Sequence, residues 1–198
     1  MPAIKKLGID GKLVIGLFLV KILAGIAIGW VSIHIYGPGN DYWDLNDAAW
    51  KEYQLLLVHP GKYFSNIFVS DYPNGYAGMF SSMDSYWNDL NGNILIKLVS
   101  VFDIFSCGNY YINSLFFNFI VFFGHVFLYK LFITIYTDRK KLAIMGCFLL
   151  PSPLYFCSGM HKDGIVFLML AILIYCVHQS LQQNKITKKY LVFILISL

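Results

Sequence analysis

The feature that most constrains this chain is a series of long apolar runs that are nearly free of charged residues. About 20 consecutive apolar residues form a helix long enough to cross the hydrocarbon core of a bilayer. By this measure four runs are candidate membrane spans, near residues 13–35, 112–136, 142–158 and 164–180. The sequence therefore predicts an all-α fold, a polytopic bundle of transmembrane helices in which residues 1–198 form a single membrane domain.

A fifth apolar run begins at Tyr190 and stops at Leu198. Roughly nine residues are about half of what a crossing needs, so we expect this sequence to be the N-terminal piece of a longer membrane protein. The composition agrees with a lipid-embedded chain, since 13% of its residues are charged, against about 25% in a typical soluble domain. The net charge of +4 is scattered along the chain, so we expect the lipid bilayer, and no nucleic acid, as a partner.

Basic residues beside the runs predict the orientation, because cytoplasmic flanks carry an excess of Lys and Arg. Three basic flanks occur, made of Lys5, Lys6 and Lys12, then Arg139, Lys140 and Lys141, then Lys185, Lys188 and Lys189. All three can be cytoplasmic at once, because two predicted spans separate each flank from the next. We therefore expect a multi-pass protein of the cytoplasmic (inner) membrane with a cytoplasmic N-terminus. Segments 36–111 and 158–163 then lie on the outer side.

The long outer loop, residues 36–111, has helical patterns of its own. One predicted helix runs over residues 44–58 and ends at a His-Pro-Gly sequence. A second covers residues 94–105, where polar residues recur at every third position and so share one face, namely Lys97, Ser100 and Asp103. An apolar helix with one polar face is typical of a helix that lies in the membrane interface. The sequence thus predicts an outer loop that carries two interfacial helices.

Two polar features lie inside the predicted spans. Lys21 follows Lys12 by nine residues, roughly 13 Å of helix, so we predict that its side chain extends to the cytoplasmic interface. Polar residues at four- and seven-residue spacings share one face of the second run, namely Ser114, Asn118 and His125. Such a stripe predicts hydrogen bonds between membrane helices.

An acidic run follows the first predicted span, with Asp41, Asp44 and Asp47 spaced three residues apart. On a helix this spacing places the carboxylates on one broad face. They could bind a divalent cation through oxygen ligands or supply one general base. Equally, Asp41 or Asp44 could cap the helix, with the others favoured by the positive end of its dipole. The spacing leaves these interpretations open.

Three ionisable residues, His161, Lys162 and Asp163, stand between the third and fourth runs. Asp163 is predicted to cap the fourth helix. Lys162 then lies at a helix N-terminus, where the dipole disfavours a cation unless an anion shares the site. Lys162, His161 and free backbone N–H groups would together suit a phosphate. The alternative is that Lys162 only reaches lipid headgroups or water.

The order of these elements resembles the GT-C class of membrane glycosyltransferases, which includes the protein O-mannosyltransferases. The shared layout is one span, a long acidic outer loop with two surface helices, and then closely spaced spans. A second likeness is to a Pro-Ser…Ser-Gly-x-x-Lys-Asp/Glu pattern of uncharacterised bacterial membrane glycosyltransferases and polysaccharide polymerases. That pattern is carried here by Pro151, Ser152, Ser158, Gly159, Lys162, Asp163 and Gly164. The chain departs from many GT-C enzymes in lacking an Asp-Glu pair after the first span.

The resemblance implies an enzyme that takes a sugar from a polyprenyl-phosphate-linked donor at the outer face of the membrane. Asp41, with Asp44 as second choice, matches the catalytic aspartate of that class. Lys162 and His161 match the outer basic residues that meet the donor phosphate. The acceptor and the sugar stay open, as does the cofactor, for which a divalent cation held by Asp41, Asp44 and Asp47 is one option.

Two other hypotheses remain. A polysaccharide polymerase or ligase would also act on lipid-linked glycans, but such enzymes lean on outer basic residues, which are few here. A transporter or non-catalytic membrane subunit is the third hypothesis. Transporters tend to place ionisable or unwound segments near the middle of the membrane. In this sequence the charges gather at the predicted outer surface, and Lys21 is the main exception.

Overall fold

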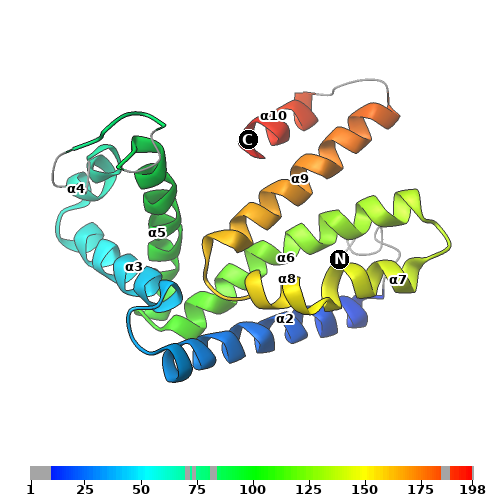
Figure 1. Ribbon diagram of the computed structural model, residues 1–198, viewed down its shortest axis with the longest axis horizontal. Helices are drawn as coiled ribbons and strands as arrows, with labels where there is room; N and C mark the ends of the chain where they lie inside the picture. Colours follow the sequence, from blue (N-terminus) through cyan, green and yellow to red (C-terminus); the bar gives the residue numbers. More distant parts are fainter. Residues whose placement is uncertain (1–9, 70–71, 73–74, 81–83, 184–187, 198) are drawn as a thin grey trace.

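The computed structural model describes residues 10–69, 72, 75–80, 84–183 and 188–197. These residues form helices and no strand, which confirms the all-α prediction for the described part of the chain. In chain order (Figure 1) the elements are α2 (Gly11–Val31), the π-helical turn η1 (Ser32–Tyr36), α3 (Asp41–Val58), α4 (Pro60–Ser65), the 3-10 turn η2 (Asn66–Phe68), α5 (Tyr86–Ser106), α6 (Tyr110–Ile135), α7 (Lys140–Ile144), the π-helical turn η3 (Met145–Leu149), α8 (Pro151–Phe156), α9 (Lys162–Gln182) and α10 (Lys188–Ser197).

Among the described residues, three helices are long and apolar enough to cross a membrane: α2 continued by η1, then α6, then α9. The central helix α6 packs against both α2 and α9, so the three form one bundle (Figure 1). Large apolar side chains point away from it, among them Leu19, Leu23, Phe119, Phe123, Val166 and Leu170. An apolar outer surface is what lipid-facing helices require, and this supports the prediction of a multi-pass membrane protein.

The predicted span at residues 142–158 is not one continuous helix. It consists of α7, η3 and α8, and the chain breaks at Leu150, which adopts an extended conformation (φ −63°, ψ 133°). Pro151 causes this break, because a proline disfavours the helical conformation of the residue before it and donates no hydrogen bond itself. The segment packs against α2 and α6 rather than standing alone.

Both helices predicted in the long loop are present, as α3 and α5, and they are longer than expected. With α4 between them they form the α3–α5 module, residues 41–106, which occupies one end of the molecule (Figure 1). The polar face of α5 is turned into the protein, since Ser100 and Asp103 are fully buried, Ser100 beside Tyr63 of α4 and Asp103 beside Asn113 of α6. The apolar face is exposed at Val101, Ile104 and Phe105. The polar residues of α5 therefore face the protein interior, and the interfacial location of α3 and α5 stays a prediction.

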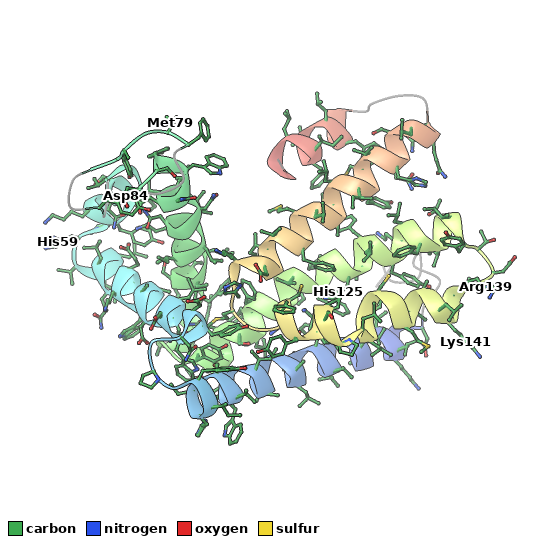
Figure 2. The ribbon with its side chains drawn as sticks, in the orientation of Figure 1. His59, Met79, Asp84, His125, Arg139 and Lys141 are labelled. Atoms are coloured by element: carbon green, nitrogen blue, oxygen red, sulfur yellow. The ribbon has the colours of Figure 1, made fainter. Side chains whose placement is uncertain are left out.

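The polar stripe predicted on α6 does join helices. The side-chain amide of Asn118 donates to the Ser158 carbonyl oxygen at 2.8 Å. His125, near the middle of the bundle in Figure 2, places Nδ1 2.6 Å from the Cys147 carbonyl oxygen. A carbonyl only accepts, so Nδ1 carries the hydrogen. This prediction is confirmed.

The basic flanks that can be located lie at the end of the bundle opposite the α3–α5 module. Figure 2 shows Arg139 and Lys141 at that end, with His59 and Asp84 at the other. The start of α2 and the end of α9 lie at the same end as Arg139 (Figure 1). Lys5, Lys6 and Lys185 fall outside the described residues. The start of α2 and the connection between α6 and α7 thus share one end of the bundle, and the orientation of the chain in a membrane stays a prediction.

Candidate functional site

The acidic run and the His-Lys-Asp tip meet in one pocket of about 390 Å³. Asp41 and Asp44 line it from the first turn of α3, and His161 and Lys162 line it from the start of α9. Apolar side chains complete its wall, namely Leu45, Ala48, Leu95 and Ile96. The structure therefore brings together four of the predicted site residues from distant parts of the sequence. We call this space the α3–α9 pocket.

The start of α3 is fixed by Asn40 rather than by an aspartate. The Asn40 side-chain oxygen accepts from the Trp43 N–H at 3.3 Å, and its amide donates to the Gly37 carbonyl at 2.7 Å. Asp41 and Asp44 follow in the first turn. Capping by Asp41 or Asp44, one of the interpretations that the spacing left open, is therefore wrong, whereas both carboxylates do lie at the positive end of the α3 dipole.

The start of α9 differs from prediction in the same way. His161 is the N-cap, with Nδ1 3.4 Å from the backbone N of Asp163, while Asp163 lies in the first turn. The second ring nitrogen of His161, Nε2, lies 3.6 Å from Asp41 Oδ2, and Nδ1 lies 3.2 Å from Asp163 Oδ2. Two carboxylates thus lie beside the imidazole. Lys162 is the first residue of the helix, as predicted.

The pocket is open to ligands on its acidic side. The Asp41 side chain is 84% exposed, whereas the His161 side chain is 20% exposed. Asp47 is also exposed, but it does not line the pocket. In the described part of the chain, no three His, Cys, Asp or Glu side chains are grouped closely enough to hold a metal ion. Asp41, Asp44 and Asp47 therefore do not form the three-carboxylate metal site that their spacing suggested.

Tyr42 belongs to this site and was not identified from the sequence. Its ring packs beside His161 at 5.6 Å between centroids and lies over Gly159, where an added Cβ would come within 2.7 Å of the ring. Burial raises the pKa of Tyr42 above its ordinary value, and the charges of Asp163 and Asp41 add to this rise. Tyr42 is therefore a neutral hydrogen-bonding group. Its position beside Asp41 in the sequence was the available signal.

An apolar groove continues from the α3–α9 pocket between α5 and α9. It has a volume of about 260 Å³ and shares Leu95 and Lys162 with the pocket. The remaining lining is mainly aliphatic, with Asn91, Ile94, Leu98, Ile165 and Val166. Lys162 therefore lies between the polar α3–α9 pocket and the apolar groove. Sequence patterns did not indicate this groove, because it is made by two helices that are far apart in the chain.

Lys21 lies inside the bundle below the tip, with 2% of the residue exposed. Its ammonium donates to the Cys157 carbonyl at 2.7 Å and to Ser158 Oγ at 3.2 Å. The predicted extension of this side chain to the cytoplasmic interface is therefore wrong. The physical reason is local: the break at Pro151 leaves α8 as a short helix whose C-terminal carbonyls offer a negative dipole end to the ammonium.

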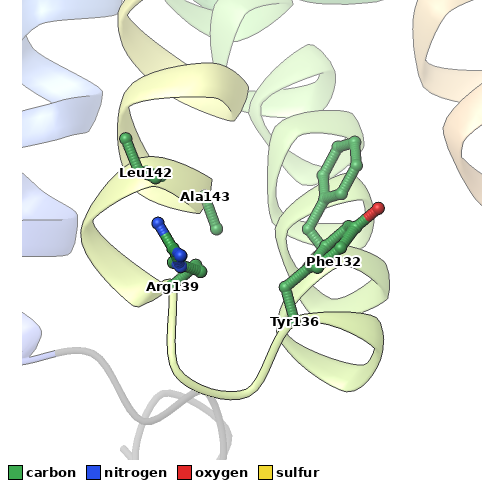
Figure 3. Close-up of a pocket in the computed structure, with 5 residues that line it drawn as sticks. All are labelled: Phe132, Tyr136, Arg139, Leu142 and Ala143. Carbon is green, nitrogen blue, oxygen red and sulfur yellow. The ribbon is translucent and has the colours of Figure 1, made fainter.

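A separate pocket of about 400 Å³ lies between α6 and α7 at the opposite end of the bundle (Figure 3). Its walls are apolar and aromatic, and Arg139 is the charged residue among those that line it, with Phe132, Tyr136, Leu142 and Ala143. It lacks the combination of carboxylate, imidazole and ammonium groups found in the α3–α9 pocket. The α3–α9 pocket is therefore the better candidate for chemistry.

Comparison with known proteins adds no relative, because no family model, no curated protein and no solved structure matches this chain. The resemblance to the GT-C class therefore stands on layout and on the short sequence patterns alone. A functional assignment has to start from the geometry of the α3–α9 pocket and the groove beside it.

Proposed function

We propose that this protein is a GT-C-like glycosyltransferase that takes a sugar from a polyprenyl-phosphate-linked donor at the outer face of the cytoplasmic membrane. One observation carries the proposal: Asp41, Asp44, His161 and Lys162 line a single pocket that opens into an apolar groove. The starts of α3 and α9, which line the pocket, lie at the end of the bundle away from α7 (Figure 1), and Arg139 and Lys141 lie at the other end (Figure 2), which supports an outer location by the positive-inside rule.

Asp41 is the proposed general base. In the transfer, the acceptor hydroxyl oxygen bonds to the anomeric carbon of the sugar while the bond from that carbon to the phosphate oxygen breaks. The carboxylate takes the hydroxyl proton, and polyprenyl phosphate leaves with the electron pair. Asp41 suits this role because its carboxylate lines the pocket and is open to an incoming acceptor. Asp44, one turn along α3, is the second choice.

Lys162 and His161 are proposed to hold the donor phosphate. Lys162 is the first residue of α9, so its ammonium lies at the positive end of the helix dipole, where an anion is favoured. This arrangement accounts for a cation at the positive end of a helix, which is unfavourable without an anion. As the glycosidic bond breaks, the same groups stabilise the growing negative charge on the leaving phosphate.

The groove between α5 and α9 is proposed to take the first isoprene units of the donor lipid. Lys162 lines this groove together with aliphatic side chains such as Leu95, Ile165 and Val166. A phosphate at Lys162 would thus leave its hydrocarbon chain facing apolar side chains rather than water. This pairing of a polar pocket with an aliphatic groove favours a lipid-linked donor over a soluble nucleotide sugar.

The test is sugar transfer by the full-length protein in nanodiscs, with a labelled polyprenyl-phosphate sugar and mass analysis of the product. Asp41→Asn should lower the rate by about 100-fold or more, and Lys162→Ala should raise the donor KM by about 10-fold. Asp47→Asn is the matched control, because this exposed carboxylate lies on α3 outside the pocket. Wild-type rates in Asp41→Asn, Asp44→Asn and Lys162→Ala would refute the assignment. A product extended by a whole glycan block would instead identify a polymerase or ligase.

A transporter is the second candidate, and a specific observation favours it. The buried Lys21 and the broken segment α7–η3–α8 are an ionisable group and an interrupted helix within the bundle, as transporters use. Uptake of a labelled substrate by proteoliposomes, lost in Lys21→Met and retained in Asp41→Asn, would support this candidate over the enzyme.

A further inference from the structure

We propose that Lys21 is a positioning residue for the α3–α9 pocket, acting from within the membrane bundle. Lys21 and Asn118 both donate hydrogen bonds to Cys157 and Ser158, an arrangement that we call the Lys21 clamp. These two residues directly precede the tip that carries His161 and Lys162. The clamp is a feature of the fold alone, whereas its effect on donor binding rests on the proposed function.

Two membrane helices contribute to the clamp. Lys21 on α2 donates to the Cys157 carbonyl and to Ser158 Oγ, at 2.7 and 3.2 Å. Asn118 on α6 donates to the Ser158 carbonyl at 2.8 Å. Consecutive residues of one turn are thus held from two sides, and Ser158 is fully buried.

The packing around the clamp is tight enough to transmit its geometry. A Cβ added at Gly25 would lie 2.6 Å from the Ser158 carbonyl oxygen and 3.0 Å from Ser114 Oγ. Glycine is therefore required there for α2 to approach the turn. Met160, the residue before His161, is also fully buried. The tip has little freedom between the clamp and the start of α9, so a loosened clamp shifts His161 and Lys162.

A buried lysine is energetically unfavourable inside a membrane, so packing alone does not explain why a lysine holds this turn. A charged lysine at the centre of a membrane helix costs a few kcal/mol, and among the described residues no carboxylate forms an ion pair with Lys21. A neutral side chain such as Asn or Gln would satisfy the same carbonyl without the charge. The positive charge adds a stronger hold on the negative end of α8.

The first test measures hydrogen–deuterium exchange of the full-length protein in nanodiscs. In Lys21→Met we expect exchange at residues 157–164 to rise by about 10-fold, while amides of α3 keep wild-type exchange. Lys12→Met is the matched control, since it removes an exposed lysine from the same helix. Unchanged exchange at residues 157–164 would overturn the clamp. Faster exchange throughout α2, α6 and α9 would overturn it too, because Lys21 would then support the whole bundle.

The second test separates positioning from stability by kinetics. In the transfer assay, Lys21→Met should raise the donor KM by about 10-fold and leave the acceptor KM unchanged. Ser158→Ala keeps both backbone carbonyl contacts and removes one acceptor, so it should raise the donor KM less. An unchanged donor KM in Lys21→Met would overturn the positioning role. If the wild-type protein transfers no sugar, the proposed function fails, and the exchange result still decides the clamp.

Discussion

Lys97 and Lys21 place an ammonium group inside two different regions of this protein, and they are held in different ways. In the α3–α5 module, Lys97 pairs with Glu52, donates to the Tyr63 carbonyl at 2.6 Å and to Asn66 Oδ1 at 2.7 Å, and lies 3.7 Å from the centre of the Tyr63 ring. In the span bundle, Lys21 meets a carbonyl and a hydroxyl. Lys97 has a counter-charge, whereas Lys21 has only neutral acceptors among the described residues.

The two lysines contribute in different ways to stability and to local geometry. An ion pair with several further hydrogen bonds ties α3, α4 and α5 together, so Lys97 contributes mainly to the stability of its module. Lys21 is buried without a carboxylate, so part of what its hydrogen bonds gain is offset by the cost of placing the charge in a membrane. The more deeply buried lysine is therefore expected to matter less for stability and more for local geometry.

Removal of Lys97 should destabilise the protein most. Lys97→Met leaves the partly buried Glu52 without its cation and two further acceptors without a donor. We expect the free energy of unfolding of the α3–α5 module to fall by about 3 kcal/mol. Exchange of α5 amides should rise, while α6 amides stay protected. Lys51→Met, on the exposed face of α3, is the control. If Lys51→Met destabilises the module as much as Lys97→Met does, the contacts of the Lys97 ammonium do not explain the loss. The contrast between Lys97 and Lys21 would then fail.

The next effect belongs to the bundle and concerns a glycine. Gly25→Ala places a Cβ 2.6 Å from the Ser158 carbonyl oxygen, so α2 must move away from the Lys21 clamp. We expect a loss of about 2 kcal/mol in unfolding free energy, typical of overpacking. Gly16→Ala is a matched control on the same helix, because nothing lies within 4 Å of its added Cβ. Thermal unfolding in detergent should separate the two, and equal melting temperatures would contradict the tight approach.

The two lysines also show how far sequence reasoning reached. Periodicity correctly placed Lys97, Ser100 and Asp103 on one helix face, and hydropathy identified α2, α6 and α9. Periodicity does not say toward which side a face turns. Ser100 turns inward because α4 offers the Tyr63 hydroxyl, 2.9 Å from Ser100 Oγ, and Asp103 turns inward because Asn113 of α6 donates to its carboxylate at 2.7 Å. That information lies in tertiary contacts rather than in the spacing.

The site was predictable in part for a similar reason. Asp41, Asp44, His161 and Lys162 were selected as unusual residues at helix ends, and the fold brings them into one pocket. The caps were missed because Asn40 and His161 compete with the neighbouring aspartates for the same N–H groups. The aliphatic groove and the position of Lys21 required knowledge of which helices become neighbours. A break at Leu150 was visible in the Pro-Ser-Pro sequence, yet hydropathy alone favoured a continuous span.

A smaller effect on stability is expected from Lys21 itself. Lys21→Met removes hydrogen bonds from a charged donor, worth about 1.5–3 kcal/mol each, but it also removes a charge that costs about 2.5–3.5 kcal/mol at the centre of a membrane helix. We expect a net loss of about 1 kcal/mol in unfolding free energy, measured by denaturant titration in detergent. A loss larger than that of Lys97→Met would reverse the comparison and assign Lys21 a structural role.

The smallest effect compares two buried serines, one in each region. Ser100→Ala leaves the Tyr63 hydroxyl without its partner inside the α3–α5 module, so a loss of about 1 kcal/mol is expected. Ser158→Ala leaves Lys21 bound to the Cys157 carbonyl and Asn118 bound to the Ser158 carbonyl. The hydrogen bond that it removes is the longer of the two that Lys21 makes, at 3.2 Å, so its loss should fall below that of a full hydrogen bond to a charged group and be roughly half that of Ser100→Ala. The same denaturant titration measures both variants. If Ser158→Ala lowers the unfolding free energy more than Ser100→Ala does, the Ser158 hydroxyl contributes more to the Lys21 clamp than the backbone carbonyls do. The neutral acceptors of Lys21 then stabilise the protein more than the contrast with Lys97 implies.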